Sequence, residues 1–296
     1  VGKWLIERIA RVPVEVCIAS EFRYNEPVLS PNHCVIAISQ SGETADTLAA
    51  VRLAKSLGVR TVGVVNVPGS SVAREVDQAL ITCAGPEISV ASTKAYAVQL
   101  LMMYLTAVQL GLGRGTLSME RARQIVSGLM ALPAAMEEVI REDAQIRRMA
   151  ACLDETENCF FIGRGLDYPG AMEGSLKLKE ITYIHSEAYA AGELKHGAIS
   201  LITRGMPVVA LSTQAALKEK MLSNMREVAS RGARVLLLAT PETKELASDA
   251  DETFVLPASD ELLTPATAAG GMQLLAYYAA VRRGCDVDKP RNLAKS

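Results

Sequence analysis

Short apolar runs alternate along the chain with longer segments in which apolar residues recur at helical spacing. The run 35–38 precedes a helical pattern over about 44–57, and the run 61–65 follows it. A short helical segment near 71–76 and the run 79–82 complete the order strand–helix–strand–helix–strand. Continuous apolar strands separated by amphipathic helices are typical of a parallel sheet covered by helices. The pattern therefore predicts an α/β fold.

The same order of elements recurs in the second half of the chain. A strand at 208–211 is followed by a helix over about 215–231, a strand at 234–239, a helix near 242–248 and a strand at 253–256. Three anchor pairs are separated by 173 or 174 positions, and they are Ser39 with Ser212, Gly58 with Gly232, and Asp77 with Asp251. A fixed offset of this kind predicts two tandem copies of one α/β domain.

The repeat also predicts where the two copies meet. Residues 117–153 have a helical pattern with one polar face, and Pro133 is expected to start a new helix there. We therefore place a first domain with linker helices at 1–145 and a second domain at 146–296. The second copy opens with an apolar strand and a Gly-rich turn, Cys159–Gly165, whose counterpart in the first copy would precede Val1. We expect the sequence to be part of a longer chain that contains this strand and turn.

Composition and charge narrow the possible functions. The 296 residues contain 31 Lys and Arg against 33 Asp and Glu, and the net charge of −2 argues against a general nucleic-acid binder. The most apolar segment, 95–112, contains Gln99, Thr106 and Gln109 and is expected to be a buried core helix that does not cross a membrane. Six cysteines without a Cys-x-x-Cys pair predict mostly buried, reduced thiols in a cytoplasmic protein. Three widely separated histidines argue against a metal site, and we expect no cofactor.

The clearest candidate site is the segment Ser39-Gln-Ser-Gly-Glu-Thr44, which follows an apolar strand and opens a helix. The hydroxyls of Ser39, Ser41 and Thr44, the Gln40 amide and the N–H groups of a helix N-terminus suit a dianionic phosphate. An ordinary helix cap would need only one of these hydroxyls. The second copy has Ser212-Thr-Gln-Ala-Ala at this place, without the glycine, and we expect it to have lost phosphate binding.

Other polar segments add candidates. Ser92 or Thr93, before the most apolar helix, is expected to cap that helix. Lys177 and Glu180 share one helix face, either as an ordinary surface ion pair or, because the helix begins at the carboxyl ends of the strands, as part of a ligand site. His196, in the segment 187–197 with its glycines and ionisable groups, is a better candidate for catalysis than the other two histidines. The polar segment 286–296 contains Pro290 and is expected to be docked on the protein.

These segments together resemble the isomerase half of the glutamine–fructose-6-phosphate aminotransferases. The shared runs occur in order along nearly the whole chain, and they are Ala19-Ser-Glu-Phe-Arg-Tyr24, Ser39 to Thr47, Asn66-Val-Pro-Gly-Ser-Ser71, Val90-Ala-Ser-Thr-Lys-Ala95, Leu176-Lys-Leu-Lys-Glu-Ile181, Glu187 to Gly197, and Asp288 to Ser296. The resemblance implies two tandem flavodoxin-like sugar isomerase domains. It also implies the conversion of fructose 6-phosphate and ammonia to glucosamine 6-phosphate in amino-sugar biosynthesis. The family's glutaminase domain and its Gly-Thr-Ser turn are absent from these residues.

The resemblance also assigns roles and partners. Binding of the sugar phosphate falls to Ser39, Gln40, Ser41 and Thr44, with Val90 and Ser92 lining the site. Glu180 would move a proton between C1 and C2 with the help of Lys177, and Lys295 would form an imine with the ketose. His196 would open the sugar ring from the partner subunit of a homodimer, and a glutaminase domain in the same full-length chain would supply ammonia.

Two other functions stay open at this level. One is a deglycase that cleaves a phosphorylated fructosamine, and the other is a non-catalytic sugar-phosphate sensor. A sensor would need the phosphate loop but not Glu180, His196 and Lys295 together, and their joint presence favours an enzyme.

Overall fold

The computed structural model describes residues 1–294 and divides mainly into two compact units, Gly2–Leu117 and Ser118–Leu293. Both contain a parallel sheet covered by helices, which confirms the predicted α/β class. Each unit is described by itself below.

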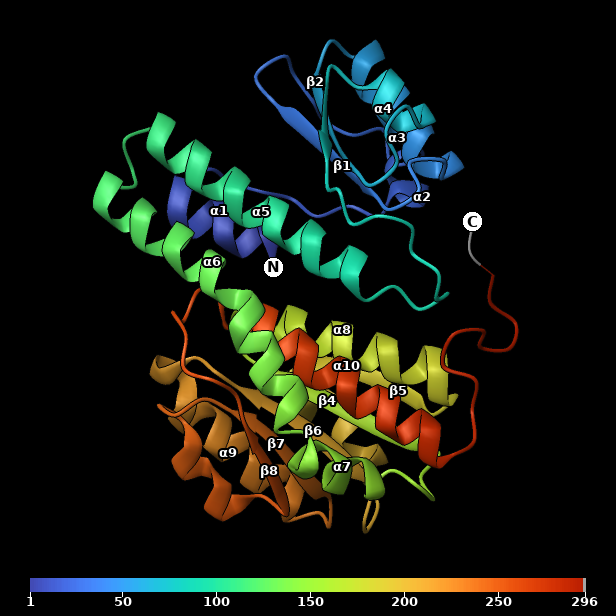
Figure 1. The fold of residues 1–296 in the computed structure, drawn as a ribbon, viewed down its shortest axis with the longest axis vertical. Coiled ribbons are helices and arrows are strands. Elements are labelled where there is room, and N and C mark those ends of the chain that lie inside the picture. The colour runs from blue at the N-terminus through green and yellow to red at the C-terminus, as the bar shows by residue number, and fades with distance from the viewer. Residues whose placement is uncertain (295–296) are drawn as a thin grey trace. The chain divides into compact units, whose positions relative to one another are not determined.

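The first unit has a three-stranded parallel sheet in the order β1-β2-β3 (Figure 1). Its elements are α1 (Gly2–Ala10), α2 (Ala19–Phe22), β1 (Cys34–Ser39), α3 (Ala45–Ser56), β2 (Arg60–Val65), α4 (Ser71–Glu75), β3 (Gln78–Ile81) and α5 (Lys94–Gly113). A small core forms where Val51 of α3 and Val72 of α4 pack against Ala37 and Val65 of the strands. The loop at the carboxyl end of β1 leads directly into α3, and this connection creates the phosphate-loop candidate.

Helix α5 is the most apolar helix of the first unit. Its length and composition alone would allow it to cross a membrane, which no other helix among the described residues does. It packs along α1, where Gly111 lies beside Ile9 and Gly2 lies beside Met103. Tyr104 of α5 is completely buried. The prediction of a buried core helix is therefore right for one face of α5 only, because Leu101, Leu105 and Leu110 are exposed.

The second unit has a five-stranded parallel sheet in the order β5-β4-β6-β7-β8. Its elements are α6 (Met119–Arg141), α7 (Ala144–Ala151), β4 (Asn158–Gly163), α8 (Asp167–Thr182), β5 (His185–Ala190), η1 (Leu194–His196), η2 (Ala198–Leu201), β6 (Pro207–Ser212), η3 (Ala215–Leu217), α9 (Lys218–Ala229), β7 (Arg234–Ala239), η4 (Lys244–Asp249), β8 (Glu252–Val255) and α10 (Thr264–Arg282). Helices α8 and α10 lie side by side over one face of the sheet (Figure 1). Met221 and Met225 of α9 pack into the core on the sheet's other face.

Matching hydrogen bonds in the two units support the predicted repeat. The Asp77 carboxylate accepts a hydrogen bond of 2.7 Å from the Thr61 backbone N–H, near the start of β2. The Asp251 carboxylate accepts one of 2.7 Å from the Val235 N–H, near the start of β7. Both pairs are thus the same contact between a loop carboxylate and the amino end of a strand.

The linker differs from the prediction. Pro133 lies inside the continuous helix α6 and does not start a new one. The compact units separate between Leu117 and Ser118, because α6 packs on α10 of the second unit, with Met136 beside Gly270. The assignment of residues 1–145 and 146–296 to two sugar isomerase domains remains a prediction.

The prediction of mostly buried cysteines was wrong. Only Cys159 is buried, whereas Cys17, Cys34 and Cys83 are exposed. Cys34 is exposed because β1 is an edge strand of the three-stranded sheet. Its counterpart in the repeat, β6, lies between β4 and β7 and is buried along its whole length. At the edge of its sheet, β1 buries only Ala37 and Ser39.

Candidate functional site

The phosphate-loop candidate forms a tight turn between β1 and α3. The Ser39 hydroxyl accepts a hydrogen bond of 3.0 Å from the Gly42 N–H and lies 3.2 Å from the Thr44 hydroxyl. The Ser41 hydroxyl accepts one of 3.2 Å from the Glu43 N–H. Thr44 precedes α3, but its side chain does not cap the helix. The structure thus brings the three predicted hydroxyls into one turn at a helix N-terminus, a favourable place for an anion.

Gly42 is required by the shape of this loop. It has φ of +69°, a conformation that side-chain-bearing residues rarely adopt. A Cβ atom at this position would lie 2.6 Å from the Cβ of Ser70, the residue that caps α4. The Gly42 carbonyl also accepts a hydrogen bond from the Val72 N–H. Backbone conformation and close packing therefore both select glycine here.

Asn66 connects the loop to the segment that follows β3. Its backbone N–H donates to the Gln40 carbonyl, and its side-chain oxygen accepts a hydrogen bond of 2.8 Å from the Ala84 N–H. The predicted residues Val90 and Ser92 follow later in this segment, both half-buried.

The structure does not show the predicted cap of α5 at Thr93. Thr93 stands directly before α5, but its side chain makes no capping hydrogen bond. The Glu87 carboxylate instead accepts a hydrogen bond of 3.0 Å from the Ala95 N–H. Glu87 lies six residues before Thr93, and its longer side chain reaches the helix from there. Capping rules place the capping residue directly before the helix and do not anticipate this contact.

In the second unit the corresponding loop is filled by a side chain of the protein itself. The Asp167 carboxylate accepts a hydrogen bond of 2.8 Å from the Thr213 N–H and another from the Thr213 hydroxyl. The Ala215 N–H donates at 3.0 Å to the Glu261 carboxylate. These N–H groups occupy the place where the first copy has its phosphate-loop candidate. This arrangement supports the prediction that the second copy does not bind phosphate.

Burial has a strong effect on Asp167. Its side chain lies among Thr213, Gln214 and Thr264, and desolvation raises the pKa of its carboxyl to about 7. The hydrogen bonds from Thr213 oppose this rise, and the nearby Glu261 carboxylate adds to it. The folded protein therefore holds a proton on Asp167 at pH values where an exposed aspartate is ionised.

The predicted pair Lys177 and Glu180 lies on α8. The Lys177 ammonium donates a short hydrogen bond to the Glu180 carboxylate. The Lys177 side chain is only 6% exposed, whereas that of Glu180 is 24% exposed. This burial is inconsistent with an ordinary surface ion pair. The lysine lies inside the protein, and its partner carboxylate reaches the surface.

Glu173 is a third ionisable group on this helix face, and the sequence analysis did not single it out. It lies one turn before Lys177 and is buried, and the Gln273 side-chain amide on α10 donates a hydrogen bond of 3.2 Å to its carboxylate. Burial raises the pKa of Glu173 to about 7, although the Lys177 ammonium lowers it. The spacing of Glu173, Lys177 and Glu180 by four and three residues was the signal available in the sequence.

Glycines let α8 approach the sheet closely enough to bury these groups. A Cβ atom on Gly174 would lie 2.8 Å from the ring of Phe161 in β4. One on Gly163, at the end of β4, would lie 2.7 Å from the Tyr168 backbone nitrogen in the first turn of α8. One on Gly170 would lie 3.0 Å from Leu211 of β6. Any side chain at these positions would push the helix outward.

The placement argument for Lys177 and Glu180 needs correction. Helix α8 starts at the carboxyl end of β4, but both residues lie near its C-terminus, toward the amino ends of the strands. They also belong to the second compact unit, whereas the phosphate-loop candidate belongs to the first. Each half of the predicted site is therefore assembled within its own unit.

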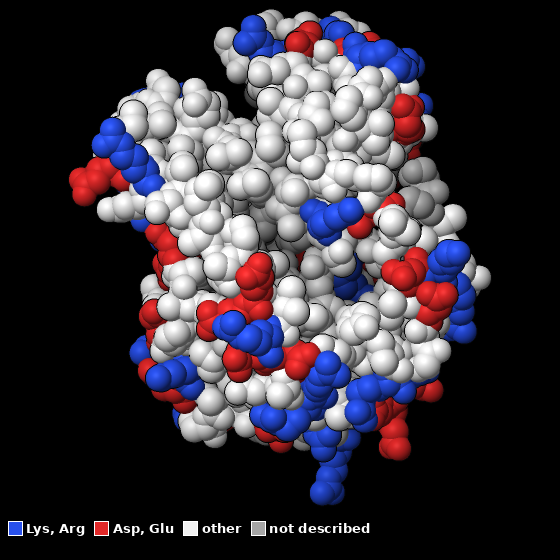
Figure 2. All heavy atoms as spheres, viewed as in Figure 1, with Lys and Arg blue, Asp and Glu red and all other residues white. Residues whose placement is uncertain are grey.

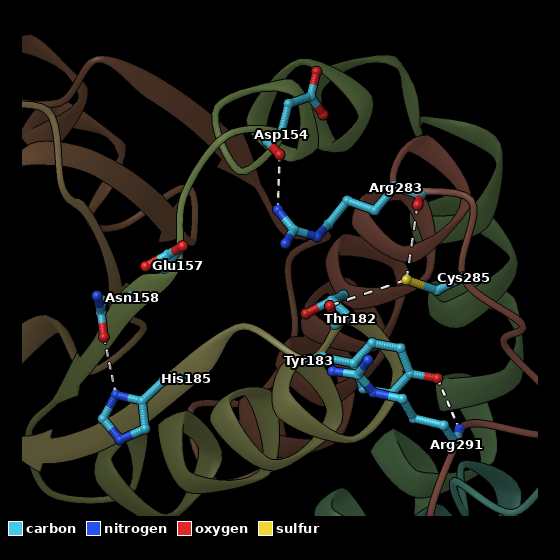
Figure 3. Close-up of a pocket in the computed structure, with 9 residues that line it drawn as sticks. All are labelled: Asp154, Glu157, Asn158, Thr182, Tyr183, His185, Arg283, Cys285 and Arg291. Carbon is cyan, nitrogen blue, oxygen red and sulfur yellow. Dashed lines mark hydrogen bonds between the residues drawn. The ribbon is translucent and has the colours of Figure 1, made fainter.

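A pocket of about 650 Å³ lies at this end of the second sheet (Figure 3). It is bounded by the start of β4, the start of β5 and the end of α8, and its lining residues are Asp154, Glu157, Asn158, Thr182, Tyr183, His185, Arg283, Cys285 and Arg291. Lys177 and Glu180 are not among them. None of the residues that sequence analysis had assigned to the site lines this pocket.

Two predicted catalytic residues are not part of the pair on α8. The side chain of His196 is 64% exposed, and its Nε2 lies 4.0 Å from the Glu193 carboxylate. Lys295 lies outside the described residues. The described part of the preceding segment is docked, as predicted: Pro290 is buried, and the Arg291 N–H donates to the Tyr183 hydroxyl at 2.8 Å.

The surface charge is mixed. Lys and Arg side chains alternate with Asp and Glu side chains over the described part of the face in Figure 2. Ion pairs among the described residues include Arg121 with Asp260 and Arg226 with Asp249. Such interleaving gives this face no broad field of one sign that would attract a polyanion.

Comparison with known proteins relates this geometry to a family. The SIS domain model matches residues 1–109 and 153–283. The chain is 52% identical over 296 residues to glutamine–fructose-6-phosphate aminotransferase (isomerizing) from Clostridium acetobutylicum, and 55% identical over 296 residues to the protein of that name from Symbiobacterium thermophilum. Each match covers 100% of this chain and 49% of the relative. The chain thus spans about half the length of these curated relatives.

A solved structure shares the fold along almost the whole chain. It is the C-terminal domain of glucosamine-fructose-6-phosphate aminotransferase from Francisella tularensis, with a TM-score of 0.93 and 39% sequence identity. The match covers 98% of this chain and 82% of that one. At this identity and coverage the likeness extends beyond the fold to the family.

Two glycines of the first unit with positive φ, Gly42 and Gly58, give a matched test of the loop. Gly42→Ala should destabilise the protein by more than Gly58→Ala, because both residues have φ near +70° but only Gly42 would collide with Ser70. We expect the backbone conformation to lower the free energy of unfolding by about 1 kcal/mol at either position. At Gly42, overpacking should add roughly 1–3 kcal/mol to this loss. Urea unfolding measures both variants, and equal losses would contradict the close contact.

The raised pKa of Asp167 predicts a pH dependence of stability. The unfolded carboxyl titrates near ~4. The folded one titrates at about 7, so this group's contribution to stability falls as the pH rises between these values. Asp167→Asn should therefore gain stability over the parent with rising pH, by up to about 1.4 kcal/mol per pH unit in this range.

Asp249 provides the control, because its ion pair with Arg226 lowers the pKa of its carboxyl. The stabilisation by the Asp249 carboxylate is present above pH ~4 and is lost at lower pH. Asp249→Asn should therefore be less stable than the parent at neutral pH. Thermal unfolding between pH 4 and pH 8 should show a slope for Asp167→Asn relative to the parent and a constant difference for Asp249→Asn. Parallel curves for Asp167→Asn and the parent would refute the buried protonated carboxyl.

Proposed function

Because the chain belongs to the SIS-domain family and, within it, to the C-terminal domains of the glutamine–fructose-6-phosphate aminotransferases, we propose that it is the ketose/aldose isomerase half of such an enzyme. Its substrates would be fructose 6-phosphate and ammonia, and its products glucosamine 6-phosphate and water. The observation that carries the proposal is the buried Lys177–Glu180 pair in a chain that matches named aminotransferases over its full length. We place this activity in the cytoplasm.

The first unit would bind the substrate phosphate. The turn formed by Ser39, Gln40, Ser41 and Thr44 offers hydroxyls, an amide and the N-terminus of α3. Charge-assisted hydrogen bonds to a phosphate are about twice as strong as neutral ones. A phosphate would therefore compete effectively with the internal hydrogen bonds of the loop. Val90 and Ser92 would line the sugar.

Ring opening and activation of the carbonyl come next. His196 would protonate the ring oxygen as the C2 hydroxyl loses its proton, which frees the C2 carbonyl. The Lys295 amine would attack C2 and form an imine with loss of water. Ammonia would then displace the lysine and leave an imine nitrogen on C2.

Glu180 would carry out the isomerisation. Its carboxylate takes a proton from C1, so that a C1–C2 double bond forms while the C2–N double bond becomes single. The proton returns to C2, the O1 hydroxyl proton passes to nitrogen, and C1 becomes an aldehyde. The hydrogen bond from Lys177 fixes the direction of this carboxylate. The partial exposure of Glu180 leaves it accessible to a substrate.

Two partners complete the proposal. The relatives are about twice as long as this chain, and we propose that a glutaminase domain in the other half of a full-length protein supplies ammonia. We also propose a homodimer in which His196 serves the partner's site. The exposed side chain of His196 and its lack of a recorded contact with Lys177 or Glu180 among the described residues support this role.

Glu180→Gln tests the chemistry. Without ammonia, Glu180 would still shuttle the proton between C1 and C2, so the chain should slowly interconvert fructose 6-phosphate and glucose 6-phosphate. The substitution keeps the shape and removes the base, and should lower this rate by ~100-fold or more while leaving fructose 6-phosphate binding nearly unchanged. A coupled assay and calorimetry measure rate and binding, with Glu242→Gln on the surface as control. An unchanged rate in Glu180→Gln would refute the assignment.

Mixed subunits test the dimer. His196→Ala and Glu180→Gln should each be inactive alone. If His196 acts across the interface, a mixed dimer contains one site with both native groups, and mixing the variants should restore part of the activity. Assays before and after subunit exchange, with the mass followed by light scattering, measure this. Mixtures as inactive as the separate variants, with exchange demonstrated, would show that both groups act within one subunit.

A further inference from the structure

The pocket at the amino end of the second sheet takes no part in the proposed chemistry (Figure 3). Its volume of about 650 Å³ is in the range of small-molecule sites. All of its lining residues belong to the second compact unit, and neither Lys177 nor Glu180 is among them. Several of the lining side chains are charged, so what the pocket can bind depends on which charges the protein itself already balances.

Arg283 is fixed in the pocket by the backbone of a neighbouring turn. Its Nη1 donates hydrogen bonds of 3.2, 2.7 and 3.2 Å to the carbonyls of Leu153, Asp154 and Thr156, which precede β4. A guanidinium has five N–H donors, and these contacts use those of Nη1 only. The neutral carbonyls therefore orient the Arg283 side chain without balancing its charge.

Arg291 is fixed in the same pocket by Tyr183. Its backbone N–H donates a hydrogen bond of 2.8 Å to the Tyr183 hydroxyl, and its guanidinium carbon lies 4.1 Å from the centroid of the tyrosine ring. The close-up shows the two side chains stacked at one side of the pocket (Figure 3). A guanidinium that stacks on a ring keeps the N–H groups in its own plane available. The stacking therefore orients Arg291 and leaves its side-chain donors for another partner.

The carboxylates in the pocket wall do not balance these two charges. Asp154 is bound by Arg282, whose Nε donates a hydrogen bond of 2.7 Å to its carboxylate. Glu157 lies on the other side of the pocket from Arg291 (Figure 3). Within residues 1–294, the structure gives neither Arg283 nor Arg291 an ion pair. Two oriented guanidiniums with unbalanced charge thus line one cavity.

We propose that this pocket is an anion site, which binds a small doubly charged molecule, a phosphate ester or a dicarboxylate, through Arg283 and Arg291. Charge-assisted hydrogen bonds from guanidinium groups to oxyanions are strong, and two guanidiniums match the charge of such a molecule. Because both side chains are already held in place, binding costs little side-chain entropy. The site belongs to the second unit and is independent of the phosphate-loop candidate and of the proposed function.

Cys285 reports occupancy of the pocket, because its half-buried thiol is one of the lining groups. The 296-residue chain is alkylated with iodoacetamide in the presence of glucose 6-phosphate or malonate, and the rate at each cysteine is followed by mass spectrometry of its peptides. Glucose is the uncharged control, and Cys34, which is exposed in the first unit, is the internal control. Hydrogen exchange of the segment 283–291 is measured in parallel as a second report of binding.

Three variants separate this pocket from the phosphate-loop candidate. Arg291→Gln removes one of the two guanidiniums. Lys289→Gln is the matched control, because it removes a positive charge two residues away from an exposed side chain that does not line the pocket. Ser41→Ala alters the phosphate-loop candidate of the first unit.

Both probes should slow the alkylation of Cys285 and the hydrogen exchange of the segment 283–291, whereas glucose should not, and Cys34 should react at one rate throughout. Arg291→Gln should raise the probe concentration for half-protection by about 10-fold or more, the effect of losing a hydrogen bond to a charged group. Lys289→Gln and Ser41→Ala should match the parent.

The two probes also identify the source of the anion. Protection by glucose 6-phosphate alone would assign the site to phosphate esters, and protection by malonate alone would assign it to dicarboxylates. Unchanged alkylation and exchange with both probes would overturn the anion site. Equal protection of Cys285 in Arg291→Gln and in the parent would overturn it as well.

Discussion

The close approach of α8 to the second sheet is the constraint on which the proposed chemistry depends. Gly163, Gly170 and Gly174 remove the side chains that would keep the helix away, and the helix then packs against both the strands and α10. This approach buries Lys177 and leaves Glu180 at the edge of the buried region. An ion pair screened by water contributes little, whereas one partly removed from water holds its geometry. The glycines thus convert a common helix spacing into a fixed acid–base pair.

The two copies of the domain show how one loop geometry can have opposite uses. In the first copy, Ser39, Ser41 and Thr44 surround a loop that keeps its glycine and no carboxylate of the protein fills it. In the second copy, the Asp167 carboxylate accepts a hydrogen bond from the Thr213 N–H of the loop. Burial of the Asp167 carboxyl favours its protonated form. A side-chain carboxyl therefore satisfies donors that would otherwise need a ligand. The two copies thus keep the same architecture but differ in what satisfies the N–H groups of this loop.

The sequence predicted the sheets, the repeat, the turn that brings Ser39 and Thr44 together, and the contact between Lys177 and Glu180, because each depends on local spacing. Features that depend on distant packing were missed or wrong. Helix α6 continues through Pro133, and Cys34 is exposed because β1 lacks a neighbour on one side. Glu87 caps α5 from a position farther along the chain than helix-capping rules consider. The buried state of Glu173 depends on α10, about a hundred residues away in sequence, and could not be seen from its own helix.

Glu173 also explains why Lys177 is directed toward Glu180. A buried lysine beside two carboxylates would divide its charge between them if both were ionised. Burial raises the pKa of the Glu173 carboxyl to about 7. The Gln273 amide also donates a hydrogen bond to one of its oxygens, and both effects weaken the attraction between Glu173 and the Lys177 ammonium. Glu180 is the more exposed of the two carboxylates and accepts the hydrogen bond from Lys177. Burial therefore decreases along this face of α8, and the lysine contacts the carboxylate that reaches the surface.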